Sequence, residues 1–371
     1  MFHLVFTLPW LLVVTRFLWP LPWRVPAKAG VALILLLAAQ YHLFSRLSSG
    51  SVFTAEMPRS LVILFNWGFS AILLLALMQI VLDLVTFLPR LVRRRLRVTP
   101  RVRYAMAIAA LVLAAIGVHE AIRVPPLKEV EVRIKNLPAA FDGYTVLQLT
   151  DLHISPLFPA AWTRAVVAGA NAANADLVVV TGDLIDGGVD IRTPDVAALR
   201  GLHAPDGVFV IPGNHEYFFD EPAWMRHFAG LGMRPLENSH TVIDRRGAQL
   251  VLAGVTDLSA GRAGYPVPDL AEALRGAPNG APVILLDHQP RHARAAAAQG
   301  VALQLSGHTH GGLIVGLDRI FALANAGFVS GLYDVGGMQL YVNNGTALWG
   351  GLALRLGKPS ELTRITLRTG Q

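Results

Sequence analysis

The sequence predicts a layered α/β domain that follows an all-α membrane region. Two observations support this prediction. Of the 371 residues, 53% are hydrophobic and only 15% are charged, whereas soluble domains carry about 25% charged residues. In the second part of the chain, short apolar runs alternate with helix-like stretches, as in a sheet covered by helices on both faces. We therefore expect a membrane region at residues 1–123 and a folded domain at residues 124–371.

The positive charge of the chain lies in its first third. Of the 32 Lys and Arg residues, 13 precede residue 124, together with only 3 of the 25 Asp and Glu residues. The first 123 residues therefore carry a net charge of +10, and the remainder carries −3. A basic chain with a total of +7 would suit a nucleic-acid-binding protein. Because the second domain is mildly acidic, we expect no nucleic-acid partner.

Four apolar stretches in the first region are candidates for membrane-spanning helices, each of which needs about 20 residues. The clearest is 60–82, which contains no charged residue. The stretches 28–46 and 103–120 lie near the lower length limit, and 2–19 is interrupted by Arg16. A cleaved signal peptide is the alternative for the first stretch. It lacks a basic start and a small-residue cleavage site, so we expect it to be retained.

Arginine counts in the short loops predict the orientation, because cytoplasmic loops are enriched in Lys and Arg. The loop between the third and fourth stretches contains Arg90, Arg93, Arg94, Arg95, Arg97, Arg101 and Arg103. The loop before it has only Arg46 and Arg59, beside Glu56. We therefore expect the arginine-rich loop in the cytoplasm and the second domain on the extracytoplasmic side. The same loop is expected to contact anionic lipid headgroups.

Residues 124–371 contain eight candidate strands and four candidate helices. The expected strands are 144–149, 177–181, 208–211, 249–253, 283–286, 303–306, 339–342 and 362–367. The expected helices are 160–173, 222–230, 270–275 and 291–299. The first strands are apolar throughout and separated by helices, which indicates a sheet that is buried on both faces.

Polar residues follow five of these strands. The segments are Thr-Asp-Leu-His at 150–153, Thr-Gly-Asp at 181–183, Pro-Gly-Asn-His-Glu at 212–216, Asp-His at 287–288 and Gly-His-Thr-His-Gly-Gly at 307–312. In layered α/β proteins, ligands bind at the carboxyl ends of the strands. We therefore expect one edge of the domain to collect seven possible metal ligands, which are Asp151, His153, Asp183, Asn214, His288, His308 and His310.

The composition of this set indicates the kind of metal. The chain contains no Cys, so disulfides and zinc–thiolate sites are excluded. Nitrogen and oxygen ligands without thiolate suit one or two ions such as Mn, Fe, Co or Zn. Two ions about 3.5–4 Å apart need a bridging group, which a carboxylate provides. Positions i and i+2 of an extended segment project to one side, so the pairs Asp151/His153 and His308/His310 should each offer two ligands.

Each segment alone has a plainer interpretation. Asp-x-His and Gly-Asp are common in turns, and Gly-Asn-His-Glu is compatible with a β-turn. His288 alone could be a hydrogen-bonded core histidine. The five segments occur in order, however, and each follows a predicted strand, which favours a metal site.

The ordered signature D-x-H, G-D, G-N-H-[DE], H, G-H-x-H, which runs here from Asp151 to His310, resembles that of the calcineurin-like metallophosphoesterases. The segments 331–333, 340–346 and 359–363 resemble the membrane-anchored bacterial branch of that family. The resemblance implies a four-layer α/β (α+β) fold, in which two mixed β-sheets pack as a sandwich flanked by helices. It refines the simpler layered α/β prediction.

The resemblance also implies roles for the site residues. Two divalent ions, Mn, Fe or Zn, are expected as cofactors. Asp151, His153 and His310 would bind the first ion, Asn214, His288 and His308 the second, and Asp183 both. A hydroxide bound to the two ions would then attack phosphorus in line.

Two further residues are expected to take part in the chemistry. His215 would donate to the phosphoryl oxygen or protonate the leaving group. Asp186 stands where some relatives have a carboxylate that orients this histidine. The alternative for Asp186 is a solvated acid in a turn before two glycines.

The expected function is hydrolysis of phosphate esters or pyrophosphates on a small-molecule or lipid-linked substrate. Together with the apolar stretches, the resemblance implies a multi-pass protein of the bacterial inner (cytoplasmic) membrane, in contact with membrane lipids. No protein partner is identifiable from the sequence. One alternative is a non-catalytic, metal-dependent membrane sensor or binding module, against which the intact His215 counts. The other is a transporter, which the scarcity of charge in the apolar stretches, mainly Arg16 and Asp83, argues against.

Overall fold

The computed structural model describes residues 2–91 and 98–370, which form two compact units. The first unit comprises the residues up to Ile122 together with Trp349–Leu356. The second unit comprises Arg123–Leu348 and the residues from Gly357 onward. The sequence analysis placed 349–356 in the second domain, whereas the structure groups this segment with the N-terminal helices.

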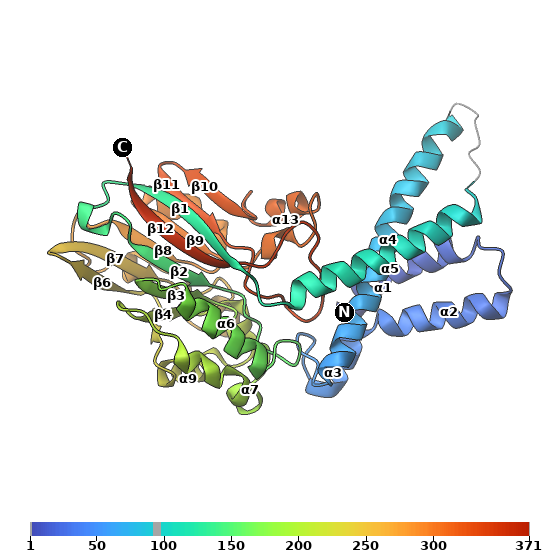
Figure 1. Ribbon diagram of the computed structural model, residues 1–371, viewed down its shortest axis with the longest axis horizontal. Helices are drawn as coiled ribbons and strands as arrows, with labels where there is room; N and C mark the ends of the chain where they lie inside the picture. Colours follow the sequence, from blue (N-terminus) through green and yellow to red (C-terminus); the bar gives the residue numbers. More distant parts are fainter. Residues whose placement is uncertain (1, 92–97, 371) are drawn as a thin grey trace. The chain divides into compact units, whose positions relative to one another are not determined.

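The regular elements of the first unit are all helices (Figure 1). Its helices are α1 (Phe2–Leu12), which continues as a π-helix (Val13–Leu18), α2 (Val25–Ala38), α3 (Tyr41–Ser49), α4 (Arg59–Leu91) and α5 (Pro100–Ile122). By length and composition, Arg59–Phe87 and Pro100–Ile122 can each cross a membrane. The helices α2 and α3 qualify only as a pair bent by 49°, and Leu4–Leu18 is a shorter apolar helix. Two of the four expected stretches therefore form helices of spanning length.

Part of the arginine-rich loop cannot be compared with the prediction. Arg93, Arg94, Arg95 and Arg97 lie outside the described residues, as does the side chain of Arg90. Arg103, on α5, is described and donates to the side chain of Gln79 at 3.1 Å.

Polar groups join the helices of this unit. Arg16 pairs with Asp83 of α4 at 3.1 Å, and Gln79 donates to the same carboxylate at 2.9 Å. The two charges that interrupt the apolar stretches therefore neutralise one another, as charged groups in spanning segments usually do.

The segment Trp349–Leu356 is held among the helices by a buried amide. Asn66, on α4, donates from Nδ2 to the carbonyl of Gly350 at 2.9 Å and accepts the backbone N–H of Ala353 at 2.7 Å. The ring of Trp349 stacks on His42, with 5.4 Å between centroids. All hydrogen-bonding groups of Asn66 are thus used within the unit, which offsets the unfavourable burial of an amide.

The second unit contains two six-stranded sheets. The first has the order β1-β12-β2-β3-β4-β5 and the second β10-β11-β9-β8-β7-β6. The strands are β1 (Leu127–Lys135), β2 (Thr145–Leu149), β3 (Leu177–Thr181), β4 (Val208–Ile211), β5 (Arg234–Pro235), β6 (Ser239–Arg245), β7 (Ala248–Gly254), β8 (Val283–Leu286), β9 (Leu303–Ser306), β10 (Gly331–Val335), β11 (Met338–Val342) and β12 (Leu362–Gly370). Both sheets are mixed. In the first sheet, β12 is antiparallel to β2. In the second sheet, β10 is antiparallel to β11, and β6 is antiparallel to β7.

Helices follow the strands and cover the sheets (Figure 1). They are α6 (Ala160–Ala172), α7 (Val189–Val196), α8 (Asn214–Phe218), α9 (Glu221–Gly230), α10 (Ala260–Ala263), α11 (Leu270–Ala273), α12 (Ala293–Ala298) and α13 (Asp318–Ala324). Short 3₁₀ turns lie at Ala139–Phe141, Ala197–Gly201, Pro290–His292 and His310–Gly312.

The main core lies between the sheets. It joins Val146, Val179 and Ile211 of the first sheet to Leu252, Ile284 and Leu305 of the second, all fully buried. A second cluster, which includes Ala293 and Ala296 of α12, covers the other face of the second sheet. The expected sandwich of two mixed sheets flanked by helices is therefore confirmed.

Candidate metal centre

Five loops carry the candidate ligands, and each follows a strand that runs parallel to its neighbour. In the first sheet, β2, β3 and β4 lead to Asp151, Asp183 and Asn214. In the second sheet, β8 and β9 lead to His288 and His308. Carboxyl ends of parallel strands meet at one edge of a sheet. The Asp183–His288 contact joins the two edges, so the expected convergence is observed.

The loops reach this edge through left-handed backbone conformations. Five candidate ligands have φ between 42° and 70°: Asp151, His153, Asp183, His308 and His310. Asp and His enter this region more readily than most residues, at a cost of about 1–2 kcal/mol each. The expectation that the i and i+2 pairs lie on extended segments is therefore wrong. Local turns, rather than strand alternation, direct these side chains into the clusters.

Asp151, His153 and His310 form the first cluster. Oδ1 of Asp151 lies 3.9 Å from Nε2 of His153 and 3.7 Å from Nε2 of His310. Oδ2 of Asp151 accepts the hydroxyl of Thr150 at 2.9 Å and the backbone N–H of His308 at 3.1 Å. These two donors hold the buried carboxylate in one orientation.

Asp183, His288 and His308 form the second cluster, and Asn214 joins it. Nε2 of His288 lies 3.2 Å from Oδ2 of Asp183 and 3.2 Å from Oδ1 of Asn214. Nδ1 of His288 lies 2.8 Å from the carbonyl oxygen of Thr181. Since a carbonyl only accepts, Nδ1 is the donor and Nε2 is the atom directed into the cluster.

Asp183 contacts both clusters. Its Oδ2 lies 3.2 Å from Nε2 of His288 and 3.8 Å from Nε2 of His153. Its Oδ1 accepts the backbone N–H of His215 at 2.8 Å. A Cβ at Gly213 would lie 2.3 Å from the same Oδ1, so only glycine lets the two loops approach this closely.

Asp186 joins two histidines. Its Oδ1 lies 2.5 Å from Nδ1 of His215 and 3.2 Å from Nδ1 of His153. Asp186 is fully buried, which excludes the alternative of a solvated turn acid. Both rings are thereby oriented through Nδ1. The structure thus brings all the predicted site residues to one edge of the domain.

Three comparisons place this arrangement among known proteins. Residues 144–312 match the family described as Calcineurin-like phosphoesterase. The uncharacterized metallophosphoesterase YkuE of Bacillus subtilis is 30% identical over 247 residues, which cover 63% of this chain and 82% of YkuE. This chain belongs to the calcineurin-like metallophosphoesterase family.

Other relatives are longer. A Danio rerio protein named "Transmembrane protein with metallophosphoesterase domain" is 33% identical over 270 residues, which cover 70% of this chain and 61% of that protein. This chain therefore spans about three fifths of that relative's length. Among solved structures, the calcineurin-like phosphoesterase YfkN from Bacillus subtilis aligns with a TM-score of 0.35 and 15% identity over 56% of this chain and 82% of that one.

The titratable groups of this site shift one another's pKa values. Burial raises the pKa of Asp183, but the charges of His288 and His215 outweigh it and hold the value well below its ordinary range. Burial lowers the pKa of His215, but Asp183 and Asp186 outweigh it and raise the value to about 9. Burial and the neighbouring His288 lower the pKa of His308 to about 3. His308 is therefore neutral and has a lone pair to give.

The donor set of this site fits divalent metal ions. Nε2 of His153 is buried, has no hydrogen-bond partner among the described residues and faces two carboxylates. In each of the two clusters, three side chains place their ligand atoms within 4.8 Å of one another. An orphaned imidazole nitrogen beside carboxylate oxygens is stabilised by a cation of the Mn, Fe or Zn type.

The sequence analysis assigned no role to Glu216, which organises the loops that carry the candidate ligands. Its buried carboxylate accepts the backbone N–H groups of Gly213, Asp183 and Leu184 at 2.7, 3.0 and 2.8 Å. It thereby ties the loop after β3 to the loop after β4. The sequence feature that could have identified Glu216 is its place at the end of the Gly-Asn-His-Glu segment.

A second contribution that was missed comes from the segment after β11. The backbone N–H of Thr346 donates to the carbonyl of Thr150 at 2.8 Å, and that of Ala347 to the carbonyl of Asp151 at 3.0 Å. A Cβ at Gly345 would lie 3.0 Å from Nδ1 of His310. The segment therefore supports the first cluster from a distant part of the sequence.

Proposed function

We propose that this chain hydrolyses phosphate esters or pyrophosphates with two divalent ions, Mn, Fe or Zn. The observation that carries the proposal is the position of Asp183, whose Oδ2 faces a histidine of each cluster. A carboxylate shared between two clusters is the arrangement that a two-ion centre requires. The family to which the chain belongs supports the same reaction class.

The proposed ligand assignment follows the two clusters. Asp151, His153 and His310 hold one ion, Asn214, His288 and His308 hold the other, and Asp183 bridges them. When bound, the two ions would lower the pKa of a water nucleophile and neutralise charge on the phosphoryl oxygens.

His215 and Asp186 are proposed to manage the proton of the leaving group. His215 gives its Nδ1–H to Asp186, which leaves Nε2 as the atom that can donate outward. The carboxylate stabilises the imidazolium form, so a proton is held at Nε2 near neutral pH. Asp186 acts as a positioning residue, and His215 supplies the proton to the phosphoryl or leaving-group oxygen.

Removal of divalent metal is expected to abolish turnover. The full chain, purified in detergent and treated with EDTA, should lose hydrolysis of bis-p-nitrophenyl phosphate and p-nitrophenyl phosphate and regain it when Mn²⁺ is added. Mass spectrometry should find two bound ions per chain.

The affinity for Mn²⁺ should weaken as the pH is lowered, because His288 becomes protonated. Burial lowers its pKa, but Asp183 outweighs this and raises the pKa well above 6.5. A proton therefore competes with the metal for Nε2, and apparent Mn²⁺ affinity should weaken as the pH falls through the neutral range. Undiminished turnover after complete metal removal would refute the proposal. Two bound ions without turnover of any phosphoester would favour a metal-dependent sensor.

The substrate and cellular location are proposed from the helical unit. The helices Arg59–Phe87 and Pro100–Ile122 have spanning length and composition, and relatives are named transmembrane proteins. We place the chain in the bacterial inner membrane as a multi-pass protein, with the catalytic domain on the extracytoplasmic side. A lipid-linked phosphate or pyrophosphate would reach such a domain at high local concentration. The acidic charge of residues 124–371 disfavours nucleic acid.

A reporter fused to the C-terminus tests the proposed orientation of the chain in the membrane. Alkaline phosphatase fused after Gln371 should be active in cells, because this enzyme folds only outside the cytoplasm, whereas green fluorescent protein at the same position should be dark. Truncation before Pro100 removes one crossing, and the two signals should then exchange. A fluorescent, phosphatase-negative full-length fusion would reverse the proposed orientation.

A further inference from the structure

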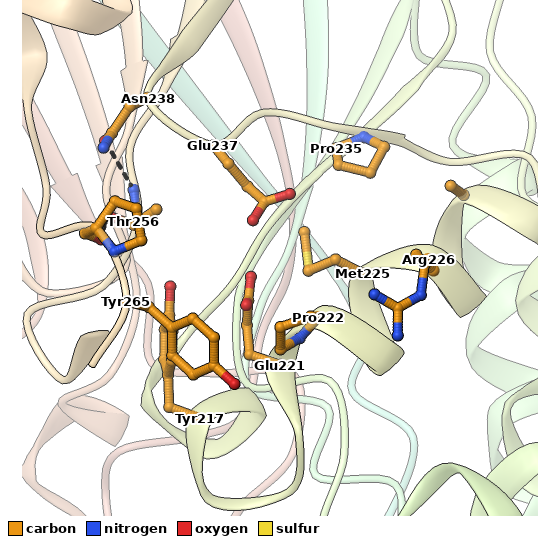
Figure 2. Close-up of a pocket in the computed structure, with 12 residues that line it drawn as sticks. Tyr217, Glu221, Pro222, Met225, Arg226, Pro235, Glu237, Asn238, Thr256 and Tyr265 are labelled. Carbon is orange, nitrogen blue, oxygen red and sulfur yellow. Dashed lines mark hydrogen bonds between the residues drawn. The ribbon is translucent and has the colours of Figure 1, made fainter. Parts of the chain in front are cut away.

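A cavity of ≈ 390 Å³ lies beside the metal centre in the second unit. Its walls come from α8 and α9 and from the loops after β5 and β7, and include Tyr217, Glu221, Met225, Glu237 and Tyr265 (Figure 2). None of these residues has a role in the proposed hydrolysis. The cavity is large enough for a small organic group.

The strand order places this cavity at the same edge as the ligand loops. Strand β5, which precedes Glu237, is the parallel neighbour of β4, which precedes Asn214. Strand β7, which leads toward Tyr265, is the parallel neighbour of β8, which precedes His288. Adjacent strands are about 5 Å apart, so the cavity lies one strand outward from the metal ligands in both sheets. Tyr217 also shares α8 with Asn214.

Two carboxyl groups, those of Glu221 and Glu237, line the cavity. Glu221 is 3% exposed, and its Oε1 has no hydrogen-bond partner among the described residues. Glu237 is exposed at the mouth. Figure 2 shows the two carboxyl groups pointing toward one another. Burial and a hydrogen bond with Glu237 raise the pKa of Glu221 to about 8. Near neutral pH the pair therefore shares one proton and carries one negative charge, and a cation beside it would stabilise the ionised form of Glu221.

The protein supplies no cation of its own to this pair. No ion pair joins Glu221 or Glu237 to a basic side chain in the part of the chain that the structure describes. Arg226 also lines the cavity, but Figure 2 shows its guanidinium on the far side of Met225 and Pro222 from the two carboxyl groups. The negative charge is therefore available to a ligand.

The remaining walls favour an organic cation over a metal ion. Tyr217 and Tyr265 lie side by side, with 5.8 Å between ring centroids, and Met225 adds a thioether. The amide oxygen of Asn238 already accepts the backbone N–H groups of Thr256 and Asp269. Among the described residues, the two glutamates belong to no group of three metal-binding side chains. Aromatic faces next to carboxylates are the usual surroundings of ammonium groups.

We propose that this cavity is a subsite for an organic ammonium group carried by one ester arm of a phosphoester bound at the metal centre. The ammonium would lie between Glu221 and Glu237 and against the rings of Tyr217 and Tyr265. Its use in turnover rests on the proposed phosphoesterase function, whereas its binding of ammonium does not.

The test compares two p-nitrophenyl phosphodiesters that differ only in charge. One carries choline and the other carries 3,3-dimethylbutanol, which is the uncharged isostere of choline. The Mn²⁺-loaded chain should hydrolyse the choline ester with a kcat/KM roughly tenfold higher. In the Glu221→Gln/Glu237→Gln double variant this ratio should fall close to one, and Tyr265→Leu, at an exposed ring, should reduce it by several-fold. Glu272→Gln, an exposed acid on α11, is the matched control and should keep the ratio.

Calorimetry separates this inference from the proposed hydrolysis. Choline added to the Mn²⁺-loaded chain should give saturable heat that the double variant loses, even if neither ester is turned over. Equal hydrolysis of the two esters, with no choline binding, would overturn the inference. Loss of one bound Mn²⁺ in the double variant would overturn it too, because the cavity would then be a metal site. Lysophosphatidylcholine and glycerophosphocholine, compared as competitors, distinguish a lipid source of the ammonium from a soluble one, and inhibition by either supports the subsite.

Discussion

Asp183→Asn is expected to lower kcat for bis-p-nitrophenyl phosphate by about 10³-fold or more. The amide has the shape of the carboxylate and still accepts the N–H of His215 through Oδ1. It replaces Oδ2, the atom shared by His288 and His153, with an uncharged group. The bridging charge between the two clusters is thereby lost while the fold is kept. Steady-state kinetics at saturating Mn²⁺ and bound metal per chain measure the effect.

The control for this substitution is Asp190→Asn. Asp190 is exposed in the first turn of α7, so the same chemical change there should leave kcat within about twofold, as surface substitutions usually do. Asp183→Asn should bind less than two ions per chain at a Mn²⁺ concentration that saturates the control. Equal kcat for the two variants would refute the bridging role, and with it the proposed hydrolytic centre.

His215→Ala is expected to lower kcat by about 10²–10⁴-fold for a phenyl ester. For the p-nitrophenyl ester of the same phosphate, kcat should fall far less, because p-nitrophenolate leaves without protonation. His215 contributes only its backbone N–H to Asp183, so the substitution should leave two bound ions per chain. A leaving-group dependence of this kind distinguishes a proton donor from a residue that merely supports the loop.

Two variants complete the test of His215. His203 is exposed on the loop after Ala197–Gly201, so His203→Ala should leave kcat for both esters unchanged. Asp186→Asn should show a weaker form of the same leaving-group dependence, because the ring of His215 loses the carboxylate charge that stabilises its imidazolium form. If His215→Ala slowed the two esters equally, the histidine would act on the phosphoryl oxygen rather than on the leaving group.

The strands that the sequence predicted differ from those it missed in their place within the sheets. The eight predicted strands are the eight interior ones, and the four missed strands β1, β5, β6 and β10 are the edges of the two sheets. Interior strands such as β3 and β4 are covered on both faces and therefore form continuous apolar runs, whereas β12 alternates apolar with polar residues. An edge strand such as β1 carries Lys, Glu and Arg at alternating exposed positions. Such a sequence contains no continuous apolar run, so hydrophobicity alone does not identify it as a strand.

The candidate metal ligands were predictable because each stands in a segment that follows an interior strand. Such a strand can be located from hydrophobicity, and the residue after it must lie at the carboxyl edge of the sheet. The route that the backbone takes there was not predictable. Asp151 and His153 were expected to project from an extended segment, but both have positive φ. A left-handed turn is stabilised by hydrogen bonds from other loops, which the local sequence does not contain.

The sequence by itself determined the family and the division between apolar helices and an acidic α/β domain. These depend on residue type and order, which hydrophobicity and metal chemistry interpret directly. Only the tertiary structure decided that Asp186 is a buried partner of His215, 29 residues away, that Glu216 ties two ligand loops together, and that Glu221 faces Glu237 in a cavity. The physical reason is that burial and partnership of a carboxyl group are set by side chains that other segments bring to it, and these set its charge and its role.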